Sequence, residues 1–222
     1  MMIPSVRLTV DTAEAQKKAP HSMPRRRLSA EESKDLIITE ASRLVSEIGF
    51  DKTTIADIAT ACRFSSANVH RIFGTREKIN HAIAGRKLTT YVAAARNEAL
   101  RETGAEGRLA TFVTSIFQTT RSMILGDKRV HQMVARAIKE RWPVFSDHRA
   151  SLLSTFREII EYGQSRDEFA TFDVEATSRA LHVSSMRFWH PEVASEMQDQ
   201  PDDCSLDRWI EFAILPLRRH SG

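Results

Sequence analysis

Apolar residues recur at intervals of three and four along most of this 222-residue chain, and no stretch of any length alternates apolar and polar residues. The first pattern is the spacing of the buried stripe of an α-helix, whereas alternation is typical of a half-buried strand. Glycine and proline number only 8 and 7, too few for a turn-rich protein of many strands. The sequence therefore predicts an all-α fold with about nine helices.

Composition narrows the class further. The chain is 41% hydrophobic and 27% charged, close to globular averages, which argues against a wholly disordered protein. No apolar run approaches the roughly 20 residues of a membrane-spanning helix, so we expect no membrane partner. Two cysteines, Cys62 and Cys204, are too few for a disulfide scaffold or a Cys-rich zinc module. Without an apolar export signal near the N-terminus, we expect a cytoplasmic protein with free thiols.

The charge is unevenly distributed. Residues 24–90 carry 12 basic and 8 acidic groups, whereas residues 91–222 carry 17 basic and 19 acidic groups. The first segment is thus net positive and the second slightly negative. This asymmetry favours a polyanion-binding segment joined to a different kind of domain, although a solvated surface has a similar surplus in many proteins.

Capping residues divide residues 29–102 into four predicted helices. Ser and Thr at an N-cap accept a hydrogen bond from a backbone amide of the first turn, and glycine ends a helix without strain. The four helices are predicted to start at Ser29, Thr54, Ser65 and Thr75. Glu32 completes a capping box with Ser29, and Asp57 lies in the first turn after Thr54. Gly49 and Gly74 end two of the helices, and the fourth helix runs to about Glu102.

The remaining sequence predicts further helices with longer apolar faces. The predicted features are a break at residues 103–107, helices over 109–125 and 126–142, a stop at Pro143, a helix capped by Ser146, a helix from Asp173 to His190, a polar loop over 193–204, and a helix over 205–215 stopped by Pro216.

Two of the predicted helices are short and joined by a tight turn. They cover Thr54–Ala61 and Ser65–Phe73, with the turn at Cys62–Phe64. The outward positions of the second helix carry the polar residues Ser66, Asn68, His70 and Arg71, as a helix that meets base edges in the major groove requires. An ordinary amphipathic hairpin with a solvated face has the same spacing, so spacing alone leaves both interpretations open.

The order of residues over Gly49–Ile79 adds a resemblance. It reads Gly-Phe-x-x-Thr-Thr-Ile-x-x-Ile-Ala, then Phe-Ser-Ser-x-Asn-Val-x-x-Ile-Phe, then Thr-Arg-Glu-x-Ile. This segment resembles the DNA-binding domain of the tetracycline-repressor (TetR) family. The resemblance implies a homodimeric, ligand-responsive transcription regulator, usually a repressor, and not an enzyme. The implied organisation is a flexible basic arm over 1–27, a helix-turn-helix domain over 28–80, and a helical ligand-binding and dimerisation domain over 81–219.

The resemblance also assigns roles in DNA binding, and two positions depart from the family pattern. Arg63 stands where the family has Gly, which implies strain in the turn, and His70 stands where the family has a phosphate-binding Tyr. The implied phosphate contacts are Thr54, Ser65, His70 and Arg76, and the implied base-edge contacts are Ser66, Asn68 and Arg71. Arg25–Arg27 precede the first helix and either enter a minor groove or form a solvated arm.

The C-terminal half shows no motif, so its roles rest on the family plan and on apolar patterning. A mainly hydrophobic small-molecule effector is expected in a pocket that includes Phe112, Ile116, Met133, Trp142 and Phe156, although such a stripe is also typical of plain core. The predicted dimer interface pairs a small-residue face, Ala176, Ala180 and Ser184, with an apolar face, Leu206, Trp209, Ile210 and Ala213.

Three functions remain open at this point. The first is a ligand-responsive regulator bound to an inverted-repeat operator in double-stranded DNA. The second is a constitutive dimeric DNA-binding protein without a ligand, which a solid core would favour. The third is an all-α enzyme, for which the sequence shows no motif. No metal site or cofactor is expected, because the eight histidines show no ligand spacing.

Overall fold

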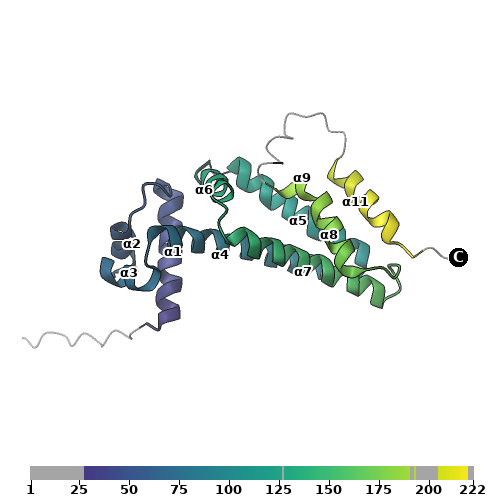
Figure 1. The fold of residues 1–222 in the computed structure, drawn as a ribbon, viewed down its shortest axis with the longest axis horizontal. Helices are drawn as coiled ribbons and strands as arrows, with labels where there is room; N and C mark the ends of the chain where they lie inside the picture. The colour runs from purple at the N-terminus through teal and green to yellow at the C-terminus, as the bar shows by residue number, and fades with distance from the viewer. Residues whose placement is uncertain (1–27, 127, 191–192, 194–204, 220–222) are drawn as a thin grey trace, which may run out of the picture.

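The computed structural model of this protein describes residues 28–126, 128–190, 193 and 205–219, and its regular structure is helical (Figure 1). Within the described ranges, one antiparallel bridge joins Phe169 and Arg218. The predicted basic arm with Arg25–Arg27 and residues 194–204 of the loop predicted over 193–204, including Cys204, lie outside the described residues. The helices are α1 (Ala30–Ile48), α2 (Ile55–Cys62), α3 (Ser66–Phe73), α4 (Arg76–Ala99), α5 (Ala105–Gly126), α6 (Lys128–Lys139), α7 (Val144–Ser165), α8 (Val174–Ser184), α9 (Met186–Trp189) and α11 (Leu206–Ile214), followed by a 3₁₀ turn at Leu215–Leu217.

The first four helices begin at the predicted caps. Ser29 and Glu32 form a reciprocal capping box, and the side chains of Ser65 and Thr75 each accept a backbone amide three residues on. Gly49 and Gly74 follow α1 and α3 with positive φ angles of 91° and 77°. Because each cap is an interaction between residues three apart, the sequence alone could predict it.

Several predicted boundaries in the C-terminal half are wrong. The helix predicted over 126–142 spans only Lys128–Lys139, because Gly126 ends α5 and Arg141 leaves the helical conformation. Helix α5 starts at Ala105, inside the predicted break, because the Glu168 carboxylate accepts the Ala105 amide at 2.5 Å from 63 residues away. Helix α7 starts directly after Pro143 and not at Ser146, since proline has no N–H to lose in a first turn. The helix predicted from Asp173 breaks at Ser185, whose hydroxyl donates to the backbone carbonyl of His182 at 3.1 Å and so competes with regular helix bonding.

The helices build two hydrophobic cores that share α4. Helices α1, α2 and α3 pack at one end of the molecule, and α5, α7, α8, α9 and α11 form the other end (Figure 1). The first core contains Ile37, Ile58, Val69 and Ile79, but also Met133 of α6. The second contains the buried faces of α4, α5 and α7. Helix α4 therefore crosses the predicted domain boundary at residue 80 without a break.

None of the helices among the described residues is long and apolar enough to cross a bilayer.

Candidate DNA interface and effector cavity

The start of α2 is fixed by a carboxylate. The Thr54 hydroxyl donates to Asp57 Oδ2 at 2.6 Å, and the Thr54 amide donates to the same oxygen at 2.9 Å. These hydrogen bonds lower the pKa of Asp57 below its ordinary value. Thr54 is exposed at the positive end of α2, where an anion is stabilised. Its hydroxyl proton, however, is engaged by Asp57, so a phosphate there would compete with that bond.

The turn between α2 and α3 contains the strain that the sequence predicts. Arg63 has φ 54° and ψ 40°, the left-handed conformation that glycine adopts more readily. The following amide of Phe64 donates to the Ala59 carbonyl at 2.8 Å and closes the end of α2. Ile58 and Val69 are buried beneath the turn. The structure thus keeps the tight turn between α2 and α3 although an arginine replaces the expected glycine.

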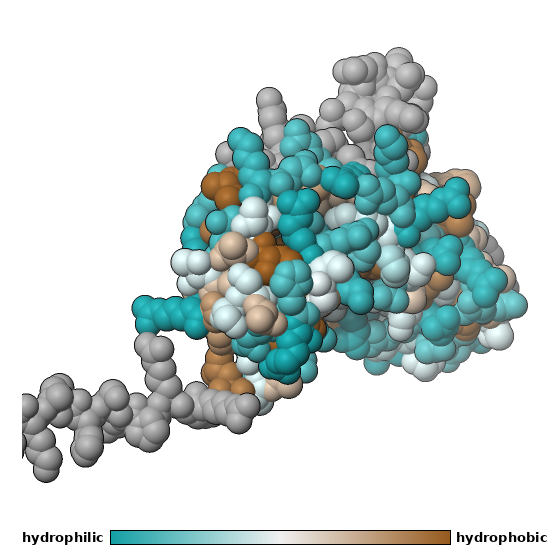
Figure 2. Space-filling view, turned by 60° about the vertical axis from the view of Figure 1, so that its left-hand side comes forward, coloured by the Kyte–Doolittle hydropathy of each residue, from teal (hydrophilic) through white to brown (hydrophobic). Residues whose placement is uncertain are grey.

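The outward side chains of α3 are polar, and two of them hydrogen-bond to each other. Ser65, Ser66, His70 and Arg71 are exposed, and Asn68 is half-buried. The Arg71 guanidinium donates to Asn68 Oδ1 at 2.8 Å. All five belong to one short helix and its N-cap, and Figure 2 shows hydrophilic residues mixed with neutral and hydrophobic ones on the end of the molecule that carries α1 to α3.

His70 presents a restricted hydrogen-bonding pattern. Its Nδ1 lies 2.9 Å from the carbonyl oxygen of Gly74. Since a carbonyl only accepts, Nδ1 must carry the hydrogen, and the other ring nitrogen, Nε2, is then an acceptor in the neutral ring. His70 donates to a phosphate through Nε2 only when the ring is doubly protonated. This differs from the tyrosine that the family pattern has at this position.

Arg76 braces the loop before α2. Its Nη1 donates to the carbonyls of Asp51, at 2.8 Å, and Thr53, at 3.3 Å. The guanidinium is half-buried beside the start of α2. A phosphate contact by Arg76 would therefore come from a side chain that also holds Thr54 in place.

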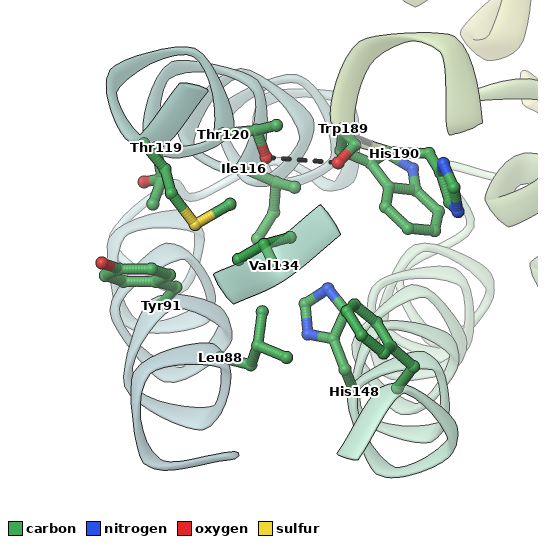
Figure 3. Close-up of a pocket in the computed structure, with 11 residues that line it drawn as sticks. Leu88, Tyr91, Ile116, Thr119, Thr120, Val134, His148, Trp189 and His190 are labelled. Atoms are coloured by element: carbon green, nitrogen blue, oxygen red, sulfur yellow. Dashed lines mark hydrogen bonds between the residues drawn. The ribbon is translucent and has the colours of Figure 1, made fainter. Parts of the chain in front are cut away.

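A small apolar cavity lies between α4, α5, α6 and α7 (Figure 3). Its volume is about 40 Å³, enough for one or two water-sized groups. Leu88, Ile116 and Val134 face it from three helices, and His148 points into it from α7 (Figure 3). Thr120 closes one side by donating to the backbone carbonyl of Trp189 at 3.4 Å.

An outer groove of about 330 Å³ adjoins this cavity. Four residues line both spaces and form a wall between them: Phe145, His148, Trp189 and His190. The outer side of the groove carries Arg141 and Arg149 together with the buried His182.

The predicted pocket residues divide between these spaces and the cores. Ile116 lines the cavity and Trp142 lines the outer groove. Phe112 and Phe156 pack edge-to-face at 5.2 Å in the second core, and Met133 is buried in the first; these three line neither space. The sequence analysis missed His148, although it continues the buried stripe of α7 four residues before Leu152. A polar residue on that stripe is the signal that would have found it.

The residues predicted to pair across a dimer fall into two groups. Ala176, Ala180 and Ser184 are exposed on α8. On α11, by contrast, Trp209 and Ala213 are buried within the chain, and Leu206 and Ile210 are half-buried against the same core. Trp209 lies 5.9 Å from Phe188, centroid to centroid.

The outward face of α11 is formed by other apolar residues. Phe212 is 72% exposed and Leu215 is 58% exposed, while Val183 on α8 is 63% exposed. The sequence predicts Trp209 at the interface, on one apolar face with Leu206, Ile210 and Ala213, whereas the structure buries Trp209 in its own chain. An apolar stripe alone does not show which of its edges points inward.

Helix α6 connects the two ends of the molecule. Val134 and Ile138 line the cavity and the groove, while Met133 and Ala137 belong to the core beneath α1, α2 and α3. Arg136 also donates to Asp51 Oδ1, at 3.0 Å, in the loop that Arg76 braces. A shift of α6 would therefore reach the start of α2.

Comparisons with known families agree with this architecture. The profile described as "Bacterial regulatory proteins, tetR family" matches residues 37–83, and "Tetracyclin repressor-like, C-terminal domain" matches residues 105–208. The chain belongs to the tetracycline-repressor family. Members of this family are DNA-binding transcriptional regulators that usually dimerise and are typically not enzymes.

Solved structures show the same fold at low sequence identity. A tetR-family regulatory protein from Rhodococcus RHA1 is 20% identical with a TM-score of 0.51, covering 86% of this chain and 99% of that one. The fatty acid degradation regulator FadR from Bacillus halodurans is 16% identical with a TM-score of 0.53, covering 82% and 92%. The superantigen PfiT is 16% identical with a TM-score of 0.55, covering 87% and 100%. No curated protein matches the chain.

Proposed function

We propose that this TetR-family regulator is a homodimeric repressor that a small, mainly hydrophobic ligand releases from an inverted-repeat operator. The observation that carries the proposal is the position of α6, which contacts the effector cavity on one face and the core of the helix-turn-helix on the other. A ligand that enlarges the cavity pushes against Val134, and the displacement reaches Asp51 through Arg136.

The exposed face of α3 supports the DNA part of the proposal. Ser66, Asn68 and Arg71 are the proposed base-reading residues, because they lie on α3, are exposed or half-buried, and provide both donors and acceptors. Thr54, Ser65, His70 and Arg76 are the proposed phosphate contacts, since they surround the starts of α2 and α3 or flank α3.

The dimer part of the proposal rests on exposed apolar surface. Val183 lies on α8, Phe212 on α11 and Leu215 in the 3₁₀ turn after it, at the end of the molecule away from α2 and α3 (Figure 1). A two-fold partner would cover them together with Ala176 and Ala180 and leave both α3 helices free for DNA.

A constitutive DNA-binding protein without an effector is the second candidate. It would be favoured by a solid core, whereas the described residues enclose a cavity beside an outer groove. The cavity therefore supports the ligand-responsive candidate.

The direct test is selection of bound sequences from a pool of random duplex DNA by the full chain. We expect an enriched inverted repeat whose affinity falls steeply with rising salt, because phosphate contacts release counterions. Recovery of no common sequence would contradict the regulator proposal, and a single half-site without its repeat would contradict the dimeric mode of binding.

A further inference from the structure

The cavity and the outer groove differ in chemistry. The inner cavity is lined mainly by aliphatic and aromatic side chains, whereas the outer groove carries Arg141 and Arg149 beside three histidines. Among the described residues that line either space, none is Asp or Glu. Glu140, the acidic neighbour of Arg141 in sequence, is occupied by Arg136 at 2.7 Å and by the indole N–H of Trp142 at 2.9 Å. The groove is therefore electropositive at its outer edge and apolar at its inner edge.

The three histidines that line the groove have unused hydrogen-bonding atoms. His148 Nδ1, His182 Nε2 and His190 Nδ1 are buried and have no hydrogen-bond partner among the described residues. His182 and Trp189 pack with ring centroids 4.9 Å apart, and His148 meets the same indole at 6.1 Å. Leaving such nitrogens without a partner is unfavourable, so their arrangement suits a ligand that supplies one.

The backbone at Arg141 is a separate indication that its side chain matters. Its φ of 54° is left-handed, and its amide and that of Trp142 close the end of α6 on the carbonyls of Ile138 and Ala137. Glycine or asparagine adopts this conformation at lower cost. Retaining an arginine there places a fixed positive charge at the groove in spite of the strain.

We propose that the effector is an organic acid, with an apolar body and a single carboxylate. The apolar body lies against Trp189 and Phe145 and reaches into the inner cavity by displacing the wall. The carboxylate is held at the outer edge by Arg141 and Arg149, with His182 donating to it. This assignment rests on the proposed function, because it names the ligand class of the same effector site.

The groove volume agrees with this division. The cavity of about 40 Å³ is too small for the whole ligand, whereas the groove of about 330 Å³ falls in the usual range of small-molecule sites. A ligand that occupies both must move the wall residues, of which Phe145 and His148 are on α7. The same step would press on Val134 and so on α6.

Calorimetric titration of the full chain with two matched series tests the ligand class. The probes are decanoate, decanol and decylamine, and phenylpropionate, phenylpropanol and phenylpropylamine. We expect at least one acid to bind about ten-fold or more tightly than its alcohol, because charge-assisted hydrogen bonds exceed neutral ones by that margin, and the amines to bind weakest.

Variants then locate the carboxylate. Arg149→Gln should reduce acid affinity to that of the alcohol and leave alcohol affinity unchanged, whereas the control Arg101→Gln, in the exposed turn after α4, should alter neither. Arg141→Gly should weaken acid binding while raising the melting temperature, a combination that a purely structural arginine would not give. Circular dichroism verifies that each variant is folded.

Three outcomes would overturn the proposal: equal affinity of acid and alcohol, a preference for the acid that survives both arginine variants, or no binding of either acid. Operator binding, measured in parallel on the same samples, separates these failures from failure of the proposed function. A protein that binds its operator but prefers no acid remains a regulator. One that binds an acid through the arginines but selects no DNA keeps its carboxylate site.

Discussion

Arg63 and Arg141 occupy the same left-handed backbone region, with φ of 54° at both positions, yet they serve different parts of the molecule. Arg63 forms the turn between α2 and α3, and Arg141 leads from α6 to α7. Each left-handed residue with a Cβ costs about 1–2 kcal/mol relative to the right-handed conformation. At Arg63 the sequence already indicates the strain, because the family pattern has glycine there. At Arg141 no pattern marks it.

Arg63→Gly should raise the free energy of unfolding by about 0.5–1 kcal/mol, since relief of the left-handed strain exceeds the added entropy of the unfolded chain. Urea unfolding measures this change. Arg63→Ala is the control, because it removes the side chain but keeps the Cβ, and it should give no such gain. Equal effects of the two substitutions would assign the change to the lost side chain and not to the backbone.

Asn68→Ala or Arg71→Ala should relax base preference at one position in each half-site, at a cost of about 1–3 kcal/mol against the preferred base. Because Arg71 donates to Asn68, the double substitution should lose less than the sum of the two. Fluorescence anisotropy on the selected operator and on its point variants measures both effects.

Arg76→Ala provides the contrast for this experiment. It should weaken all duplexes similarly and flatten the salt dependence, as loss of a phosphate contact does. If Asn68→Ala or Arg71→Ala weakened the affinity for all duplexes equally, those side chains would contact the DNA backbone and not the bases.

At the scale of elements, the sequence predicts those helix boundaries that depend on interactions between residues close together in the chain. Caps such as Thr54 with Asp57 are local pairs, so the starts of α1 to α4 could be predicted correctly. The start of α5 could not, because its capping carboxylate, Glu168, comes from beyond α7. The residues that line the cavity could not be predicted for a related reason. Core residues such as Phe112 and lining residues such as Ile116 have the same spacing and hydrophobicity, and they differ only in how they pack in the folded chain.

Helix α7 contributes a pH-dependent term to stability through His148. Burial, and to a smaller extent His182, lowers the pKa of His148 to about 4 from its ordinary value of 6.5. Between these two pH values the unfolded chain binds a proton that the folded chain does not. Stability is therefore fully present above pH 6.5 and falls as the pH decreases toward 4.

His148→Gln should remove this term. Between pH 7 and pH 5 the unmodified chain should lose about 1–2 kcal/mol more unfolding free energy than the variant, from a maximum of about 1.4 kcal/mol per pH unit. Urea unfolding at both pH values provides the comparison. Parallel losses in the two proteins would mean that His148 does not titrate in this window.

At the scale of the whole molecule, the three most exposed large apolar residues, Val183, Phe212 and Leu215, and the proposed DNA-binding surface lie at opposite ends (Figure 1). Phe212 and Leu215 point away from the core, whereas Trp209 on the same helix points into it. The two kinds of position should respond differently to substitution, because one contributes to association and the other to folding.

Phe212→Asp should give a folded monomer with greatly weakened operator affinity, since burial of an interface aromatic is typically worth about 2 kcal/mol or more. Trp209→Ala should instead lower the free energy of unfolding by about 3–5 kcal/mol, as loss of a buried aromatic does. Sedimentation with circular dichroism distinguishes the two. A folded Phe212→Asp protein that stays dimeric would move the interface away from α11.

The core shared between the two ends of the molecule also limits how such a regulator can be recombined. The core beneath α1 to α3 is completed by Met133 and Ala137 of α6 and by Ile83 of α4. A chimera joined at residue 80 would therefore pack the helix-turn-helix domain of one protein against α6 of another. The junction would be continuous along the chain and mismatched in space. A working biosensor chimera therefore has to transplant the inner face of α6 along with the head, and its success should depend on matching side-chain volumes at residues 83, 133 and 137 more than on the position of the cut.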